Sequence, residues 1–354
     1  MRVFDVILYG ILVAAAIFVA WSVLHGYWRG LGVYLVHRAG PPPLHASRHR
    51  LWRDPGKVEA LDLTGGPGGR DGAPAPPFTF IEEHAAGSQP CLSVHDARGR
   101  RWRVKWGHEV QPETFAVRLA WACGYFAEET YFVPSGTVEQ AAHLQRTSSC
   151  IDAANGRFAD ARFELDDPAV KKLFEEHSWA WHDNPFVGTK ELDGLKIVVM
   201  LLSNWDTKDR RDVARGSNTA IFELRGSRRR WGAREARYLI TDWGGAMGKW
   251  GANVVNRGRW DPAGFEAQTP AFATAVQDGI VSFGYAGQRT ADIARGIPLE
   301  HVRWFHGIAG RLSERQLVDA LAASGASDEE QTRFARALIA RIRQLGDLTD
   351  SGHS

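Results

Sequence analysis

Two short acidic motifs hold the residues best suited to chemistry. In the first, Asn-Trp-Asp-Thr-Lys, Asp206 lies two residues before Lys208 and follows an apolar stretch. A carboxylate in such a loop can accept the proton of a hydroxyl group, while the ammonium steadies a transferring phosphoryl group. A charged turn at a helix end would have the same composition. In the second motif, Ile-Thr-Asp-Trp-Gly-Gly, Asp242 ends an apolar strand pattern. Mg²⁺ prefers one or two carboxylates with phosphate oxygens, so Asp242 is a candidate metal ligand, and a turn aspartate is the alternative.

A lysine and two glutamates earlier in the chain form a second candidate group. Lys105 belongs to the alternating stretch RWRVKW, and its ammonium can hold a phosphate as a point charge. Glu109 and Glu113 stand at the start of the helical pattern that follows. Either carboxylate can pair with Lys105 and aim it, and the sequence leaves open which one does. A solvated lysine and a glutamate placed by the helix dipole are the alternatives.

The elements that must position these residues follow from hydrophobic periodicity. Alternation predicts strands in FTFIEE, CLSVHD and RWRVKW, followed by a helix from about Pro112. A buried helix is predicted over 191–203, then strands in TAIFEL and RYLITDW. The last third is helical, with capping-box patterns in SERQ and SDEE. This order predicts an α+β fold of two lobes, a small β-rich N-lobe over 78–134 and a helical C-lobe over 135–349.

The order of the four chemical parts carries more information than any one of them. A strand lysine, a helix glutamate, Asp-x-Lys after a buried helix, and a strand ending in Asp-x-Gly follow one another as the parts of a kinase do. The stretches 78–114, 184–209 and 238–249 resemble an uncharacterised bacterial family, which is in turn distantly similar to atypical kinases, including phosphatidylinositol kinases and HipA-type kinases.

The resemblance implies a two-lobed kinase-like fold that uses ATP and Mg²⁺. It matches Gly87 and Ser88 to the tip of a nucleotide-covering loop, and Lys105 to the phosphate-binding lysine, which Glu113 or Glu109 would aim. It likewise matches Asp206 to the catalytic aspartate and Asp242 to the metal ligand. The expected activity is phosphoryl transfer to a hydroxyl of unknown identity.

Two departures from the kinase pattern support a different interpretation. The metal-binding asparagine expected five residues after the catalytic aspartate is Arg211, so Asn218, just before a strand, becomes the substitute ligand. The loop HAAGSQP has a single glycine. A pseudokinase that senses nucleotide or acts as a membrane scaffold is therefore the alternative. A metal-dependent hydrolase using Asp206, Asp209 and Asp242 is a third hypothesis, although no histidine-rich ligand pattern accompanies it.

The N-terminus predicts membrane attachment. Residues 6–24 carry no charge and would span roughly 28 Å as a helix, enough for a bilayer core. We expect an anchor over 1–27, with a signal peptide as the competing interpretation. A Gly/Pro/Arg-rich linker would follow over 28–77. Arginines after the span predict a single-pass protein of the inner membrane whose catalytic part is cytoplasmic.

Composition narrows the partners. The chain has 354 residues and a formal net charge of +2, so no global charge calls for nucleic acid. Its three cysteines show no metal-binding spacing. The expected partners are the membrane, through the N-terminal helix, and an acceptor that is a protein, a lipid or a small molecule.

Overall fold

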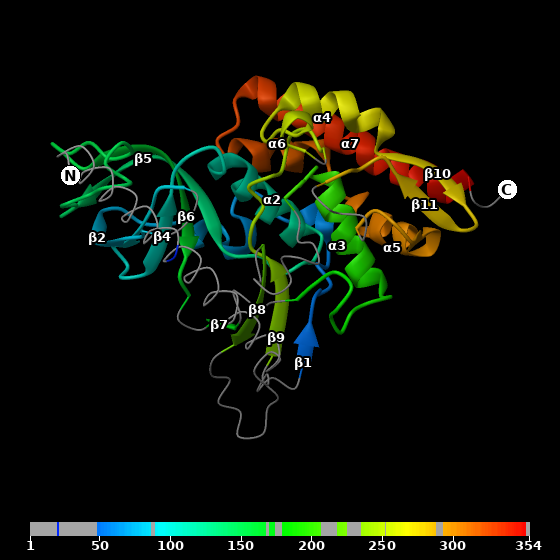
Figure 1. The fold of residues 1–354 in the computed structure, drawn as a ribbon, viewed down its shortest axis with the longest axis horizontal. Coiled ribbons are helices and arrows are strands. Elements are labelled where there is room, and N and C mark those ends of the chain that lie inside the picture. The colour runs from blue at the N-terminus through cyan, green and yellow to red at the C-terminus, as the bar shows by residue number, and fades with distance from the viewer. Residues whose placement is uncertain are drawn as a thin grey trace, which may run out of the picture.

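The computed structural model describes most of the chain from Arg48 onward (Figure 1). The predicted anchor (apart from Ala20), the loop tip at Gly87 and Ser88, and Lys208 with Asp209 lie outside the described residues. The described ranges are residue 20 and residues 48–85, 89–167, 170–173, 179–206, 218–224, 235–251, 253–287 and 293–351. Within them, no helix has both the length and the apolar character needed to cross a bilayer. The anchor therefore stays a prediction.

A closed five-stranded barrel forms one end of the molecule. Its strands run in the order β2-β3-β4-β6-β5. Side chains that alternate along the strands fill the interior, among them Trp102, Val104 and Phe163, all fully buried. The strand bounds are β2 (Phe78–Glu83), β3 (Cys91–His95), β4 (Arg101–Lys105), β5 (Thr130–Glu139) and β6 (Arg157–Leu165). The three strands predicted from alternation are confirmed, and the barrel extends beyond the predicted lobe boundary at 134.

Helix α2 (Val110–Ala122) packs between the barrel and the rest of the chain. Nearly all of its residues are buried, including Glu113 and Arg118, because it contacts β5 and β6 on one side and α3 and α6 on another. A glutamate on this helix is therefore held inside the molecule, where its carboxylate requires a partner.

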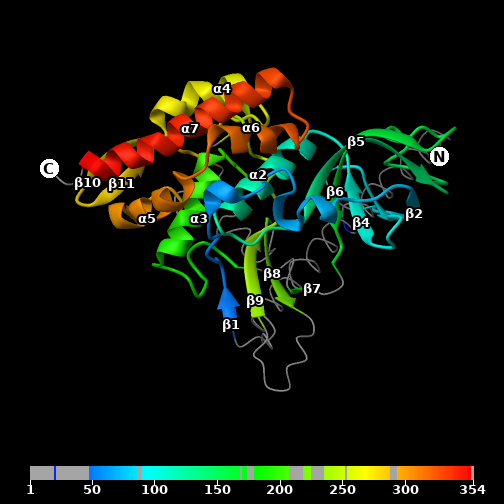
Figure 2. The same ribbon diagram turned by 180° about the vertical axis from the view of Figure 1, so that it is seen from behind.

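Helices make up the opposite end, with α7 (Asp328–Ser351) packed against α4, α5 and α6 (Figure 2). The other helices are α3 (Lys190–Leu201), α4 (Pro262–Gln268), α5 (Leu299–Ala309) and α6 (Glu314–Ala322). Ser313 forms the predicted capping box with Gln316. The small sheet β10 (Ala273–Gln277), β11 (Ile280–Phe283) and β12 (Ile297–Pro298) lies against this half. The mixed α and β composition predicted from the sequence is confirmed.

A four-stranded sheet lies beneath α2 and α3 in Figure 1. Its order is β1-β9-β8-β7, with bounds β1 (Arg48–Arg50), β7 (Val170–Leu173), β8 (Thr219–Leu224) and β9 (Glu235–Ile240). β8 and β9 pair antiparallel, as their predicted hairpin requires. Asn218 stands just before β8 and Asp242 just after β9, so both lie at the same end of this hairpin.

Residues 48–77 are structured, contrary to the expectation that 28–77 is a linker. Leu51, Val58 and Leu63 are at most 2% exposed and belong to the main core. Three short 3-10 helices carry the segment over the surface between β1 and β2. Its glycines permit close packing rather than flexibility, since the Tyr131 hydroxyl donates a hydrogen bond to the carbonyl of Gly69 at 2.8 Å.

Candidate functional site

Asp206, Asn218 and Asp242 come together where α3 and β9 end and β8 begins. After α3, Ser203 takes a left-handed backbone conformation (φ 53°), which turns the chain into the loop that carries Asp206. The side-chain amide of Asn218 donates to the backbone carbonyl of Asp206 at 2.7 Å. The amide of Asn204 donates to the backbone carbonyl of Asp242 at 3.3 Å. The structure thus joins the two acidic motifs to the asparagine proposed as a substitute ligand.

The two carboxylates share a partly buried site. Burial and the nearby charge of Asp242 raise the pKa of Asp206 to about 6. Arg257, the Asn218 hydrogen bond and Arg259 act in the opposite direction without cancelling the rise. A carboxyl group with this pKa can exchange a proton near neutral pH, as a general base must.

The glycines after Asp242 allow this close approach. The backbone N–H of Gly244 donates to Oδ1 of Asp242 at 2.9 Å. A Cβ atom at Gly245 would lie 2.9 Å from Oδ1 of Asn204 and 3.0 Å from both N and Cβ of Asp206. Only glycine fits there without moving the loop, so the Trp-Gly-Gly motif fixes the spacing of the two aspartates.

Lys105 faces this group from the barrel. It stands opposite Arg162 in the β4–β6 register and opposite Cys91 in the β3–β4 register. Because Trp102 and Val104 point into the barrel, Lys105 lies on the outer face. The charge of Arg162 and burial lower its pKa, whereas Glu164 and Asp242 act to raise it. The carboxylate of Asp242 is therefore within electrostatic range of the ammonium.

The partner of Glu113 is Arg162. Arg162 and Glu113 form a buried ion pair, with side chains 2% and 1% exposed. The second guanidinium nitrogen of Arg162 contacts Glu164 at 2.8 Å. Glu109 instead pairs with Arg259 at 2.6 Å. Neither helix carboxylate therefore forms the expected ion pair with Lys105. Arg162, which lies opposite Lys105 in the β4–β6 register, pairs with Glu113 instead.

Arg162, Arg257 and Arg259 were missed by the sequence interpretation. Arg162 falls in a region of mixed pattern, although the alternation in RFADARFEL would have placed it on one face with Glu164. Arg257 and Arg259 lie over the ring of Trp205, with their guanidinium carbons 3.9 and 5.3 Å from its centroid. A single tryptophan next to Asp206 is too weak a signal to predict that two distant arginines contact it.

A buried arginine anchors the loop from behind. Arg341 on α7 is fully buried and donates to the carbonyl of Leu201 and to the hydroxyl of Ser203, both at 2.8 Å. It also lies 3.6 Å above the ring centroid of Phe265. The last long helix thereby fixes the chain just before Asn204.

The donor set suits a magnesium ion whose coordination a nucleotide completes. The described part of the chain contains no group of three or more histidine, cysteine, aspartate or glutamate side chains that could hold a metal alone. Asp242 supplies a carboxylate, Asn218 a side-chain amide, and the buried Oδ1 of Asn204 has no hydrogen-bond partner. One carboxylate with amide and phosphate oxygens matches what Mg²⁺ prefers, so the residues fit this metal.

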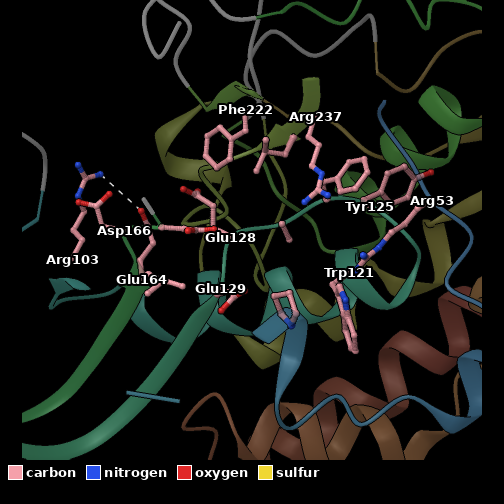
Figure 3. A pocket seen from close by; sticks show the side chains of 16 residues that line it. Arg53, Arg103, Trp121, Tyr125, Glu128, Glu129, Glu164, Asp166, Phe222 and Arg237 are labelled. Carbon is pink, nitrogen blue, oxygen red and sulfur yellow. Dashed lines mark ion pairs between the residues drawn. The ribbon is translucent and has the colours of Figure 1, made fainter. Parts of the chain in front are cut away.

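A cavity of about 290 Å³ lies where the end of β6 approaches β8 and β9 (Figure 3). Its wall combines the end of β6, the connection from α2 to β5, and residues within β8 and β9. Asp206, Asp242 and Lys105 do not line it, and Glu164 is the residue that links it to Arg162. The cavity and the acidic group are therefore different places, linked through the pair of Glu164 with Arg162.

Comparison with known proteins gives a distant structural likeness. No family model and no curated protein matches this chain. It resembles the crystal structure of the Golgi casein kinase, with a TM-score of 0.35 and 10% identity, and that of the Golgi casein kinase with Mn/ADP bound, with 0.34 and 8%. Each comparison covers 83% of this chain and 76% of the other. A likeness this low assigns the chain neither a fold family nor a role for any residue.

Proposed function

We propose that this protein transfers the terminal phosphoryl group of ATP, with Mg²⁺, to a hydroxyl acceptor. The observation that carries the proposal is that Asp206, Asn218 and Asp242 converge on a site within electrostatic range of Lys105. Phosphoryl transfer asks the protein mainly to position groups and to neutralise charge, so few side chains suffice.

Each residue has a role that follows from its surroundings. Asp242 and Asn218 would hold Mg²⁺, which would neutralise phosphate charge when bound. Lys105 binds the phosphates, since its ammonium has no ion pair with a described residue. Asp206 orients the acceptor hydroxyl and accepts its proton, which suits a pKa of about 6. Lys208, Gly87 and Ser88 keep their predicted roles beside the phosphates.

The N-terminal anchor would hold this activity at the cytoplasmic face of the inner membrane. This part of the proposal rests on the uncharged stretch 6–24 and on the arginines that follow it. The acceptor is then a protein, a lipid or a small molecule that reaches the membrane surface.

Nucleotide binding without transfer is the second candidate, and the ion pair between Glu113 and Arg162 favours it. With the helix carboxylate engaged elsewhere, Lys105 is not held in the arrangement expected of an active kinase.

Labelled ATP separates the two functions. We expect full-length protein in detergent, with Mg²⁺, to incorporate label into itself or into added protein and lipid acceptors. Asp242→Asn should reduce incorporation at least about a hundredfold, because charge stabilisation at the phosphates is lost. The matched control is Asp278→Asn, at an exposed position in the turn between β10 and β11. ATP-dependent thermal stabilisation without incorporation supports the binding module, and neither effect at millimolar ATP contradicts both.

A further inference from the structure

The cavity where β6 approaches β8 and β9 has oppositely charged ends. Figure 3 shows Glu128, Glu164 and Asp166 on the side of Arg103, and Arg53 and Arg237 on the opposite side. Of the residues that line it, five are carboxylates and three are arginines. Apart from Arg103, which lies at the acidic end and pairs with Glu164 at 3.9 Å, the two signs lie at opposite ends of the cavity.

At the acidic end, Glu129 differs in its contacts from the neighbouring carboxylates. Glu164 and Asp166 have partners, Arg162 at 2.8 Å and Arg101 at 3.1 Å. Glu129 forms no ion pair with any residue that the structure describes. Burial and then the charge of Asp167 raise its pKa. A cation bound at this end would relieve both effects, because it would replace lost hydration and offset the repulsion between carboxylates.

The basic end of the cavity is lined by arginines that have few carboxylate partners. Arg50 and Arg237 share the single carboxylate of Glu235, at 3.2 and 2.7 Å. Arg53 has no ion pair with a described residue, and burial, Arg237 and Arg50, in that order, lower its pKa. The guanidinium carbons of Arg53 and Arg237 lie 6.0 and 4.8 Å from the ring centroid of Phe126. Arg53 and Arg237 lie beside one ring, and the single carboxylate nearby is already shared by Arg50 and Arg237, so this end forms a place for an anion.

We propose that this cavity binds a small zwitterion whose cationic group lies at Glu129 and whose anionic group lies between Arg53 and Arg237. The apolar middle of the ligand would pack on Phe126, Phe222 and Leu239, which line the space between the two ends. A polyphosphate is disfavoured because its charge would meet the carboxylates of the acidic end. The inference does not depend on phosphoryl transfer, since none of the residues assigned to transfer lines the cavity.

A matched set of probes tests the charge arrangement. We use 4-aminobutanoate, 6-aminohexanoate and 8-aminooctanoate, with the alkylamine and the alkanoate of each chain length. Binding to the full-length protein in detergent is followed by tryptophan fluorescence, because Trp121 lines the cavity, and by isothermal titration calorimetry. At the best chain length, the amino acid should bind at least about tenfold more tightly than either monofunctional probe.

Two variants and two controls assign each end. Glu129→Gln should reduce the affinity of the amino acid to that of the alkanoate, and Arg53→Gln to that of the alkylamine. The exposed barrel variants Glu139→Gln and Arg157→Gln should leave it unchanged. The proposal is overturned if the monofunctional probes bind as tightly as the amino acids, or if the control variants weaken binding equally.

Competition with ATP tests whether the cavity is separate from the nucleotide site. With ATP and Mg²⁺ present, the apparent dissociation constant of the probe should change by a limited factor that saturates. An apparent constant that rises in proportion to ATP without limit would overturn the inference, because the cavity would then be part of the nucleotide site. Probe binding in a protein without transfer activity would leave this inference standing and contradict only the proposed function.

Discussion

At the scale of single residues, the surroundings of Asp206 disfavour its charged form. Its pKa is about 6 in the folded protein against 3.8 for an ordinary aspartate. Because the folded-state pKa is the higher one, the folded protein binds the proton more tightly than the unfolded chain. This contribution to stability is greatest below about pH 4 and is lost as the pH rises to about 6. At about 1.4 kcal/mol per pH unit, the loss amounts to roughly 3 kcal/mol.

We therefore expect Asp206→Asn to stabilise the protein at pH 7 by up to roughly 3 kcal/mol and to have little effect at pH 4, while abolishing transfer. Urea unfolding at both pH values, with EDTA and without nucleotide, measures the difference. Asp278→Asn should show the same small difference at both. An equal effect of Asp206→Asn at pH 4 and pH 7 would contradict the assignment.

Arg162 is the residue on which buried charge balance depends. Arg162→Met leaves Glu113 buried without its cation, and breaking a buried pair from one side costs about 3–5 kcal/mol. We expect a loss of this size in urea unfolding. The double variant Arg162→Met with Glu113→Gln should lose clearly less, because residue 113 then carries no unpaired buried charge. If the single and the double variant are equally stable, the pair does not have the role described above.

At the scale of elements, the loop before Asp206 is fixed from three sides. The loop follows directly on α3. Arg341 of α7 donates hydrogen bonds to Leu201 and Ser203, just before the loop, and the backbone after β9 packs against the loop at Gly245. Since these elements lie far apart in the sequence, the position of the carboxylate depends on the packing of the whole helical half.

Gly245→Ala tests this dependence. The new Cβ must displace Asn204 or Asp206, and misplacing a catalytic group by about 1 Å can reduce the rate about a hundredfold. We expect transfer to fall about ten- to a hundredfold while the unfolding midpoint changes little. Gly307→Ala on α5 is the matched control, because its Cβ meets no atom within 4 Å and alanine favours the helix. An active Gly245→Ala protein would show that the loop tolerates this displacement.

Elements were predictable where local periodicity matches burial. β2, β3, β4, β8 and helices α2 and α3 follow from apolar spacing, and the capping box of α6 from its Ser-x-x-Gln pattern. β6 was missed because Arg162 and Glu164 are charged yet buried, and they are stabilised there by pairing with each other, with Glu113 and with Arg103. The grouping of Asp206 with Asp242 could be predicted from chain order, whereas the arginines around them come from long-range contacts.

At the scale of the whole molecule, residues 48–77 join the two halves. Trp52 donates to the carbonyl of Cys123 at the end of α2 at 2.8 Å. Glu59 pairs with Arg311 at 2.7 Å, and Gln316 of α6 donates to the carbonyl of Val58 at 2.9 Å. Composition could not predict this, because glycine and proline are typical both of flexible linkers and of chains that pack closely in extended form.

Removing this segment should therefore destabilise the entire protein rather than trim it. Burial of Leu51, Val58 and Leu63 contributes about 1.5–3 kcal/mol each, an amount comparable with the whole stability of an ordinary domain. We expect a chain that starts at residue 78 to aggregate or to exchange its α2 and α6 amides rapidly. One that starts at residue 48 should unfold cooperatively. A third chain starting at 48 with Glu59→Gln separates the exposed ion pair, which contributes little to stability, from the apolar contacts. Equal unfolding midpoints for chains starting at 48 and 78 would show that the segment lies on the core without stabilising it.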